Sequence, residues 1–155
     1  MTETNFNPDA FMNTEIEGEL STRRIPVPEG EFPAVVEDVK AGTVGRDEPK
    51  PVLRVVWKID DMDGYVQGVT GREDNKLEQL IFLDLTEQGG LDMRDGQNIG
   101  LGRLRKALGQ NQPGQPWAPT YLIGQSAKIV CKHRADKNDP EVKYDGVATV
   151  LPIDS

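Results

Sequence analysis

Residues 94–134 read RDGQNIGLGRLRKALGQNQPGQPWAPTYLIGQSAKIVCKHR, and this stretch decides the fold that we expect the chain to adopt. Leucines recur at positions i, i+3 and i+7 within Ile99–Leu108. This spacing predicts a helix, and Gly109 suits the residue just after its end. A Pro-rich loop follows. Apolar and basic residues then alternate over Ser126–Arg134, which predicts a strand with two chemically different faces.

Four further segments have the composition of strands, at 31–40, Val52–Asp60, Leu77–Leu85 and Gly146–Ile153. The second alternates most clearly and places Trp57 on its apolar face, so we expect this ring in the core. The third is apolar on both faces, which predicts a central strand.

Three strands, one helix and two strands is the element order of the OB-fold, a partly open Greek-key barrel. We therefore expect a mainly β protein. Its five-stranded OB-fold-like barrel would carry one principal α-helix between strands three and four, and a long polar loop would span residues 60–76.

The 155 residues suit a single domain with an extension. Residues 1–22 contain acids and no basic residue, so we expect an acidic N-terminal arm, followed by an OB-like nucleic-acid-binding domain at 23–155. Within the arm, Asn7 suits a helix N-cap and Pro8 the first helical position. We expect no signal peptide, no membrane span and a cytoplasmic location, because the chain has no long apolar run and a single cysteine.

The positive charge of the chain is concentrated in residues 94–134. Seven basic residues and one acid give this stretch a net charge of +6, whereas the whole chain carries −8, so the remainder carries −14. A basic surface on an acidic body is the electrostatic pattern of a protein that binds a polyanion. The alternative is two ordinary solvated faces, one on a helix and one on a strand.

Single-strand binders combine a basic groove with aromatic rings on which bases stack. Basic residues on the predicted strands and helix, with three aromatic residues, therefore form the candidate site: Arg54, Lys58, Phe82, Arg103, Arg105, Lys106, Trp117, Tyr121, Lys128, Lys132 and Arg134. Trp117 has an equally good alternative, in which it folds back to cap the helix. The sequence has no recognition helix and no aromatic ribonucleoprotein motif, so it does not predict base-specific readout.

Catalytic, metal-binding and cofactor-binding motifs have little support. Cys131 and His133 point the same way from one strand, but no third group orients them, so a small core cysteine and a strand-end histidine are favoured. The acidic run at Asp60–Asp63 lacks the ligand spacing of a calcium loop. No phosphate-binding loop follows the glycines of the predicted helix. We therefore expect no enzyme activity and no cofactor.

Several short motifs follow one another along the chain. They are a Gly-x-aromatic strand, a Leu-x-Val strand, a helix ending in Ala-x-Gly, and a Leu-x-Gly turn into a basic strand. The residues concerned are Gly30 and Phe32, Leu53 and Val55, Ala107 and Gly109, and Leu122 and Gly124 leading to Lys128. This pattern, which covers about Pro28 to Ile153, resembles phage-encoded single-stranded DNA-binding proteins of replication and recombination modules. The resemblance implies an OB-like fold and sequence-tolerant binding of single strands, but no fixed DNA-contacting residues.

The expected function is non-catalytic binding and protection of single-stranded DNA in phage replication or recombination. Phage replication or recombination proteins are possible partners, and docking of Phe11, Met12 and Ile16 on a neighbouring copy would give a homo-oligomer. One alternative is an acidic interaction protein that mimics nucleic acid through the acids of Asp60–Asp92. Another is a structural phage protein without a ligand.

Overall fold

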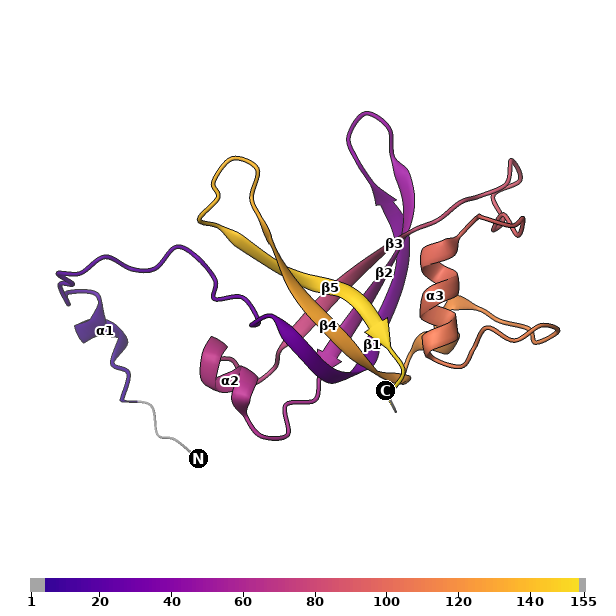
Figure 1. The fold of residues 1–155 in the computed structure, drawn as a ribbon. Coiled ribbons are helices and arrows are strands. Elements are labelled where there is room, and N and C mark those ends of the chain that lie inside the picture. The colour runs from indigo at the N-terminus through magenta and orange to yellow at the C-terminus, as the bar shows by residue number, and fades with distance from the viewer. Residues whose placement is uncertain (1–4, 154–155) are drawn as a thin grey trace.

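The computed structural model describes residues 5–153, and its main element is one five-stranded antiparallel sheet (Figure 1). The order across the sheet is β3-β2-β1-β4-β5. The strands are β1 (Gly30–Val44), β2 (Lys50–Ile59), β3 (Lys76–Phe82), β4 (Ser126–Ala135) and β5 (Lys143–Leu151). The long first strand lies at the centre and pairs with two neighbours, so that Ala34 lies opposite Ile59 of β2 and Ala127 of β4.

The helices are short, and the principal one lies where the sequence predicts it, between β3 and β4. It is α3 (Ile99–Ala107), and the others are α1 (Pro8–Phe11), α2 (Tyr65–Thr70) and the 3-10 turn η1 (Pro119–Leu122). The mainly β class with one principal helix is therefore confirmed.

The prediction of an unbroken polar loop over 60–76 is wrong, because α2 interrupts it. The carboxylate of Asp61 accepts hydrogen bonds from the backbone N–H groups of Val66 and Gln67, at 3.0 and 2.9 Å. This cap satisfies backbone donors that a helix start leaves without partners. The helix has six residues, which is too short for a repeating pattern of apolar residues to reveal it in the sequence.

The core lies on one face of the sheet and is closed by α3. Alternate residues of the strands point inward, and Trp57 of β2 is completely buried, as its place in the sequence predicts. Its indole N–H donates to the Oε1 of Gln79 on β3 at 3.0 Å. Leu101 and Leu104 of α3 are buried in the same cluster, so the leucine spacing of the helix is the reason it packs here.

The sheet is not closed into the barrel that the sequence predicts, and β3 is not the central strand. In the described residues β3 pairs only with β2, and β5 only with β4. The two edges approach each other around Gly146, where an added Cβ would lie 3.8 Å from the backbone oxygen of Glu78. Beyond this region α3 packs against both strands, and a groove remains between α3 and β5. The apolar outer residues of β3, Leu80 and Phe82, are exposed rather than covered.

Two features extend beyond the sheet. The β1–β2 and β4–β5 hairpins project on the same side of the molecule, whereas the N-terminal segment leaves the sheet on the side opposite α3 (Figure 1). Residues 5–22 are exposed throughout. The predicted cap of α1 is confirmed, because the Asn7 side chain accepts hydrogen bonds from the N–H groups of Asp9 and Ala10.

Candidate nucleic-acid interface

The residue Asn98 fixes the start of α3 and so the placement of its basic side chains. Its backbone adopts a left-handed conformation with φ of 54°. Its side-chain oxygen accepts from the backbone N–H of Asp84, and its amide donates to the carbonyl oxygens of Asp84 and Asp92, at distances of 2.8, 2.8 and 3.0 Å. These bonds attach the first turn of α3 to the loop that leaves β3.

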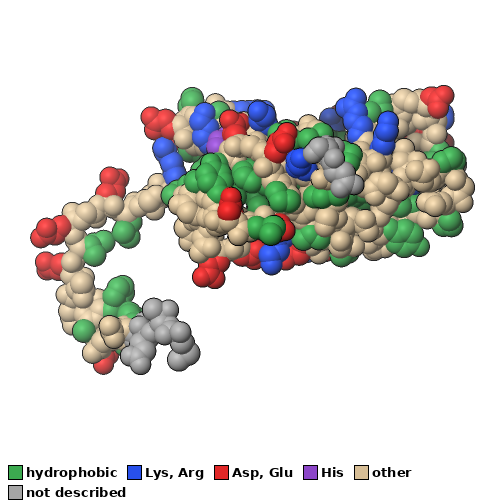
Figure 2. Space-filling view, turned by 60° about the horizontal axis from the view of Figure 1, so that its bottom comes forward, with side chains coloured by type: hydrophobic (Ala, Val, Ile, Leu, Met, Phe, Trp, Pro, Cys, Tyr) green, Lys and Arg blue, Asp and Glu red, His purple; other side chains and the backbone are tan. Residues whose placement is uncertain are grey.

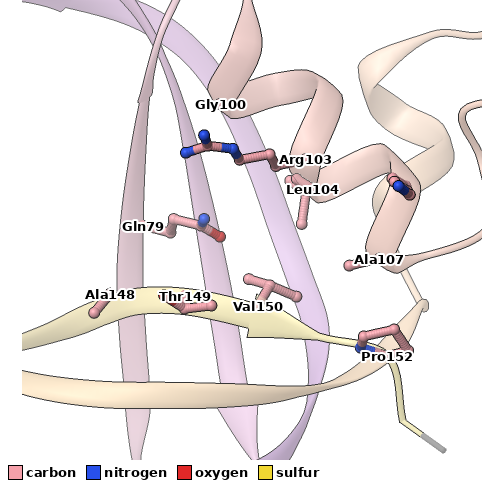
Figure 3. A pocket seen from close by; sticks show the side chains of 10 residues that line it. Gln79, Gly100, Arg103, Leu104, Ala107, Ala148, Thr149, Val150 and Pro152 are labelled. Atoms are coloured by element: carbon pink, nitrogen blue, oxygen red, sulfur yellow. The ribbon is translucent and has the colours of Figure 1, made fainter. Parts of the chain in front are cut away.

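Arg103 and Lys106 lie on the exposed side of α3, away from its buried leucines. Both line a groove of about 630 Å³ between α3 and β5. The opposite wall is formed by Ala148, Thr149, Val150 and Pro152, and Gln79 of β3 lies between the walls. Figure 3 shows Arg103 reaching from the helix toward Gln79.

A row of basic residues follows the outer face of β4, which pairs with the edge of β5 that is turned away from the groove. Lys128 lies opposite Leu151, Lys132 opposite Gly146, and Arg134 opposite Tyr144. Lys128 is half-buried, whereas Lys132 and Arg134 are exposed. The seven residues from Lys128 to Arg134 span about 20 Å at the usual rise of a strand.

We call the five residues Arg103, Lys106, Lys128, Lys132 and Arg134 the basic face. Arg103 and Lys106 line the groove at one edge of β5, and the other three follow β4, which pairs with the opposite edge of β5. Figure 2 shows groups of Lys and Arg side chains along one edge of the molecule, with a few acids among them.

Two acids lie beside the basic face. Glu31 lies opposite Val130, between the positions of Lys128 and Lys132 along the strand. The backbone N–H of His133 donates to Glu29 at 2.8 Å, and this hydrogen bond, helped by the charge of nearby Lys132, holds the pKa of Glu29 below its usual range. Glu29 is therefore anionic at neutral pH and reduces the positive potential next to Lys132.

Two of the predicted site residues contact each other and the end of α3. The guanidinium of Arg105 lies 4.5 Å from the ring centroid of Trp117 and donates to the carbonyl oxygen of Gln110. The indole N–H of Trp117 donates to the side-chain oxygen of Gln110 at 2.9 Å, and the ring packs against the core. This geometry is the one in which Trp117 folds back on the helix, and it gives Arg105 an internal partner.

The other predicted site residues lie apart from the basic face. Arg54, Lys58 and Phe82 are on the outer face of β2 and β3, where Arg54 pairs with Glu78 at 3.4 Å and the Phe82 ring is 56% exposed. Tyr121 lies on η1 and is also more than half exposed. The structure therefore brings together five of the eleven predicted residues and leaves six elsewhere.

The sequence gives no signal for Gln79 and Thr149, which line the groove. They are ordinary polar residues of two strands, and only the packing of α3 across both edges places them beside Arg103. Tyr144 is also close to the basic face, through its pairing with Arg134, and its hydroxyl donates to Asp136 at 2.6 Å. This bond to a carboxylate raises the pKa of Tyr144 and lowers that of Asp136.

Several of the acids within Asp60–Asp92 have partners within the chain. Asp61 caps α2, and Asp84 accepts from the backbone N–H of Asn98 at 2.8 Å. Asp92 is almost fully buried and forms an ion pair with Arg94 at 2.6 Å. These three carboxylates therefore contribute to local structure, and the nucleic-acid mimic stays an alternative hypothesis.

Cys131 and His133 have structural contacts. The Cys131 thiol is buried and donates to the carbonyl oxygen of Val27, and burial raises the pKa of this thiol. The Nε2 of His133 lies 2.6 Å from the same oxygen.

In residues 5–153 no cluster of three or more His, Cys, Asp or Glu side chains has the geometry of a metal site, and no helix is long and apolar enough to span a membrane. Neither a protein-family model nor a curated protein matches the chain.

Proposed function

We propose that the protein binds single-stranded DNA without strong sequence preference, through the basic face. The observation that carries the proposal is the gathering of five basic side chains from α3 and β4 on one side of a chain whose net charge is −8. Neutralising phosphates by lysine and arginine supplies sequence-independent affinity, because it releases the counterions of the nucleic acid.

The strand order gives independent support. The order β3-β2-β1-β4-β5, with β1 at the centre, is compatible with an OB-type Greek-key barrel that is open between β3 and β5. The resemblance to phage single-strand binders points to the same fold, and it favours a role in phage replication or recombination in the cytoplasm of the host cell. The function needs no cofactor and no catalytic step.

The shape of the basic face favours a single strand over a duplex. Its cations follow one β-strand and one nine-residue helix, in a row that suits the backbone of one strand. The exposed half of Tyr144, beside Arg134, offers a ring on which a base can stack, with a contribution of about 1–3 kcal/mol.

The test is a titration of labelled oligo-dT and of a duplex of equal length, followed by fluorescence anisotropy at several salt concentrations. The single strand should bind more tightly. If two to five phosphates are neutralised, log K should fall with log salt at a slope of about −1.4 to −3.5, taking ~0.7 for each contact. Equal or tighter binding of duplex, or no binding of either, would refute the proposal.

A pair of charge-reversal variants places the binding on the molecule. Lys132→Glu with Arg134→Glu should weaken binding about tenfold or more, because both side chains are exposed on the basic face. The matched control is Arg46→Glu with Lys50→Glu, which makes the same change in net charge at the tip of the β1–β2 hairpin. Equal losses in the two variants would show that only the total charge matters.

A further inference from the structure

The groove between α3 and β5 contains an open strand edge. β5 pairs with β4 on one side only, and Ala148, Thr149 and Val150 line the groove with its other side. Unpaired backbone groups at such an edge are a template for the addition of an extended segment. β3 approaches β5 at Gly146, so the accessible part of the edge begins beyond that residue.

The walls of the groove define what kind of segment fits. Leu104, Ala107, Val150 and Pro152 supply apolar surface, and Arg103 and Lys106 supply positive charge. A complementary strand would place small or apolar side chains on one face and acids on the other.

Residues 15–20 of the same chain have this pattern. They read EIEGEL, so three glutamates alternate with Ile16, Gly18 and Leu20. An extended chain places these two sets on opposite faces. The structure has no helix over these residues, and Ile16 and Leu20 are 68% and 73% exposed, without a packing partner for their apolar surface.

A chain cannot readily place this segment in its own groove. Arg23 forms ion pairs with Asp139 and Glu141 just before β5 begins, at 3.0 and 3.2 Å. Leu20 is three residues away, a span of about 10 Å at most. The groove lies beyond Gly146, where β3 blocks the path along the edge, and the N-terminal segment leaves on the side opposite α3 (Figure 1).

We propose that residues 15–20 of one copy add as a strand to the β5 edge of a second copy, in the groove between α3 and β5. Ile16 and Leu20 then pack on the apolar walls, and the three glutamates lie near Arg103 and Lys106. A reciprocal exchange closes a dimer, and a head-to-tail exchange continues into a chain of copies.

This assembly does not depend on the proposed function, because it needs only the groove and the segment. The two are linked where they share residues. Arg103 and Lys106 belong to the basic face, so a docked segment competes with DNA for them and leaves Lys128, Lys132 and Arg134 accessible.

The experiment measures molecular mass by size-exclusion chromatography with light scattering, over a range of protein concentrations at low salt. The segment variant is Glu15→Lys/Glu17→Lys/Glu19→Lys, and the groove variant is Arg103→Glu/Lys106→Glu. Wild-type protein should associate as its concentration rises, and each variant alone should remain monomeric because segment and groove then carry like charge. An equimolar mixture of the two variants should associate again, because each segment then meets a groove of opposite charge.

Controls separate this contact from general charge effects. Asp47→Lys/Glu87→Lys/Asp95→Lys makes the same charge change at exposed positions outside the segment and should associate like the wild type. If the groove variant does not fold, as judged by circular dichroism, Ala148→Arg fills the groove from an exposed position instead and should also abolish association. A monomeric wild type, association of the segment variant alone, or a mixture that stays monomeric would overturn the proposal.

Discussion

Replacing Asn98 should loosen α3 from the sheet, because this residue alone joins the helix start to two separate points of the preceding loop. Asn98→Gly removes three side-chain hydrogen bonds, to the N–H and C=O of Asp84 and the C=O of Asp92. Asn98→Ala removes the same bonds and keeps a Cβ at a φ of 54°, a conformation that asparagine tolerates better than alanine.

The size of each effect follows from these contacts. Three partly exposed hydrogen bonds contribute about 1.5–3 kcal/mol together, so Asn98→Gly should lower the free energy of unfolding by about that amount. Asn98→Ala should cost about 1 kcal/mol more, because the left-handed strain of alanine exceeds the chain entropy that glycine adds to the unfolded state.

Urea unfolding followed by circular dichroism measures these differences, with Gln97→Ala as an exposed neighbouring control that should have no effect. Hydrogen exchange should show loss of protection in α3 before the central strands. If Asn98→Gly is as stable as the wild type, the three bonds do not contribute to stability. If the glycine and alanine variants are equally stable, the backbone is not strained at this residue.

Three other changes test separate parts of the structure. Trp117→Ala should lower the free energy of unfolding by about 2 kcal/mol, because packing is lost, and should leave the affinity for oligo-dT unchanged. Urea unfolding and fluorescence anisotropy measure the two quantities. A loss of about 1–3 kcal/mol in binding free energy would instead mean that the ring stacks on a base. The hydrogen bond from Arg94 lowers the pKa of Asp92 in the folded protein. The ionised Asp92 carboxylate therefore stabilises the fold above its unfolded pKa of ~3.9, and this stabilisation is lost as pH falls through the lower folded pKa. Urea unfolding at neutral and acidic pH should therefore show less acid destabilisation in Asp92→Asn than in the wild type, and equal acid sensitivity would contradict this. A chain lacking residues 1–22 should bind single-stranded DNA more tightly at low salt, because a tethered anion no longer competes for the basic face, and unchanged affinity would contradict this.

The parts of the fold that depend on local spacing could be predicted from the sequence. The leucines of α3, the alternation of β2 and the cap formed by Asn7 each act within a few residues, and each is present in the structure. Burial of Trp57 follows from the same alternation.

The parts that depend on long-range packing could not be predicted. The pattern of β3 favours a central strand, but β3 lies at an edge, because α3 packs against both β3 and β5 and leaves a groove beside β5 in place of a β3–β5 pairing. The separation of six predicted site residues from the basic face has the same origin. Charge and strand face identify Lys132 and Arg134, but only the fold shows that Arg105 turns back onto Trp117.

An acidic protein can hold a polyanion on one face because electrostatic repulsion in salt solution is local. At physiological ionic strength the Debye length is about 8 Å, so acids on distant loops act weakly on a strand bound along β4. Many of the acids also have local partners: Asp61 caps α2, and Asp92 pairs with Arg94. The acids that matter most for binding are those next to the cations, Glu29 and Glu31. In the proposed complex, Glu29 and Glu31 would lower the affinity of the basic face for phosphate, and the rest of the acidic surface would disfavour other modes of binding.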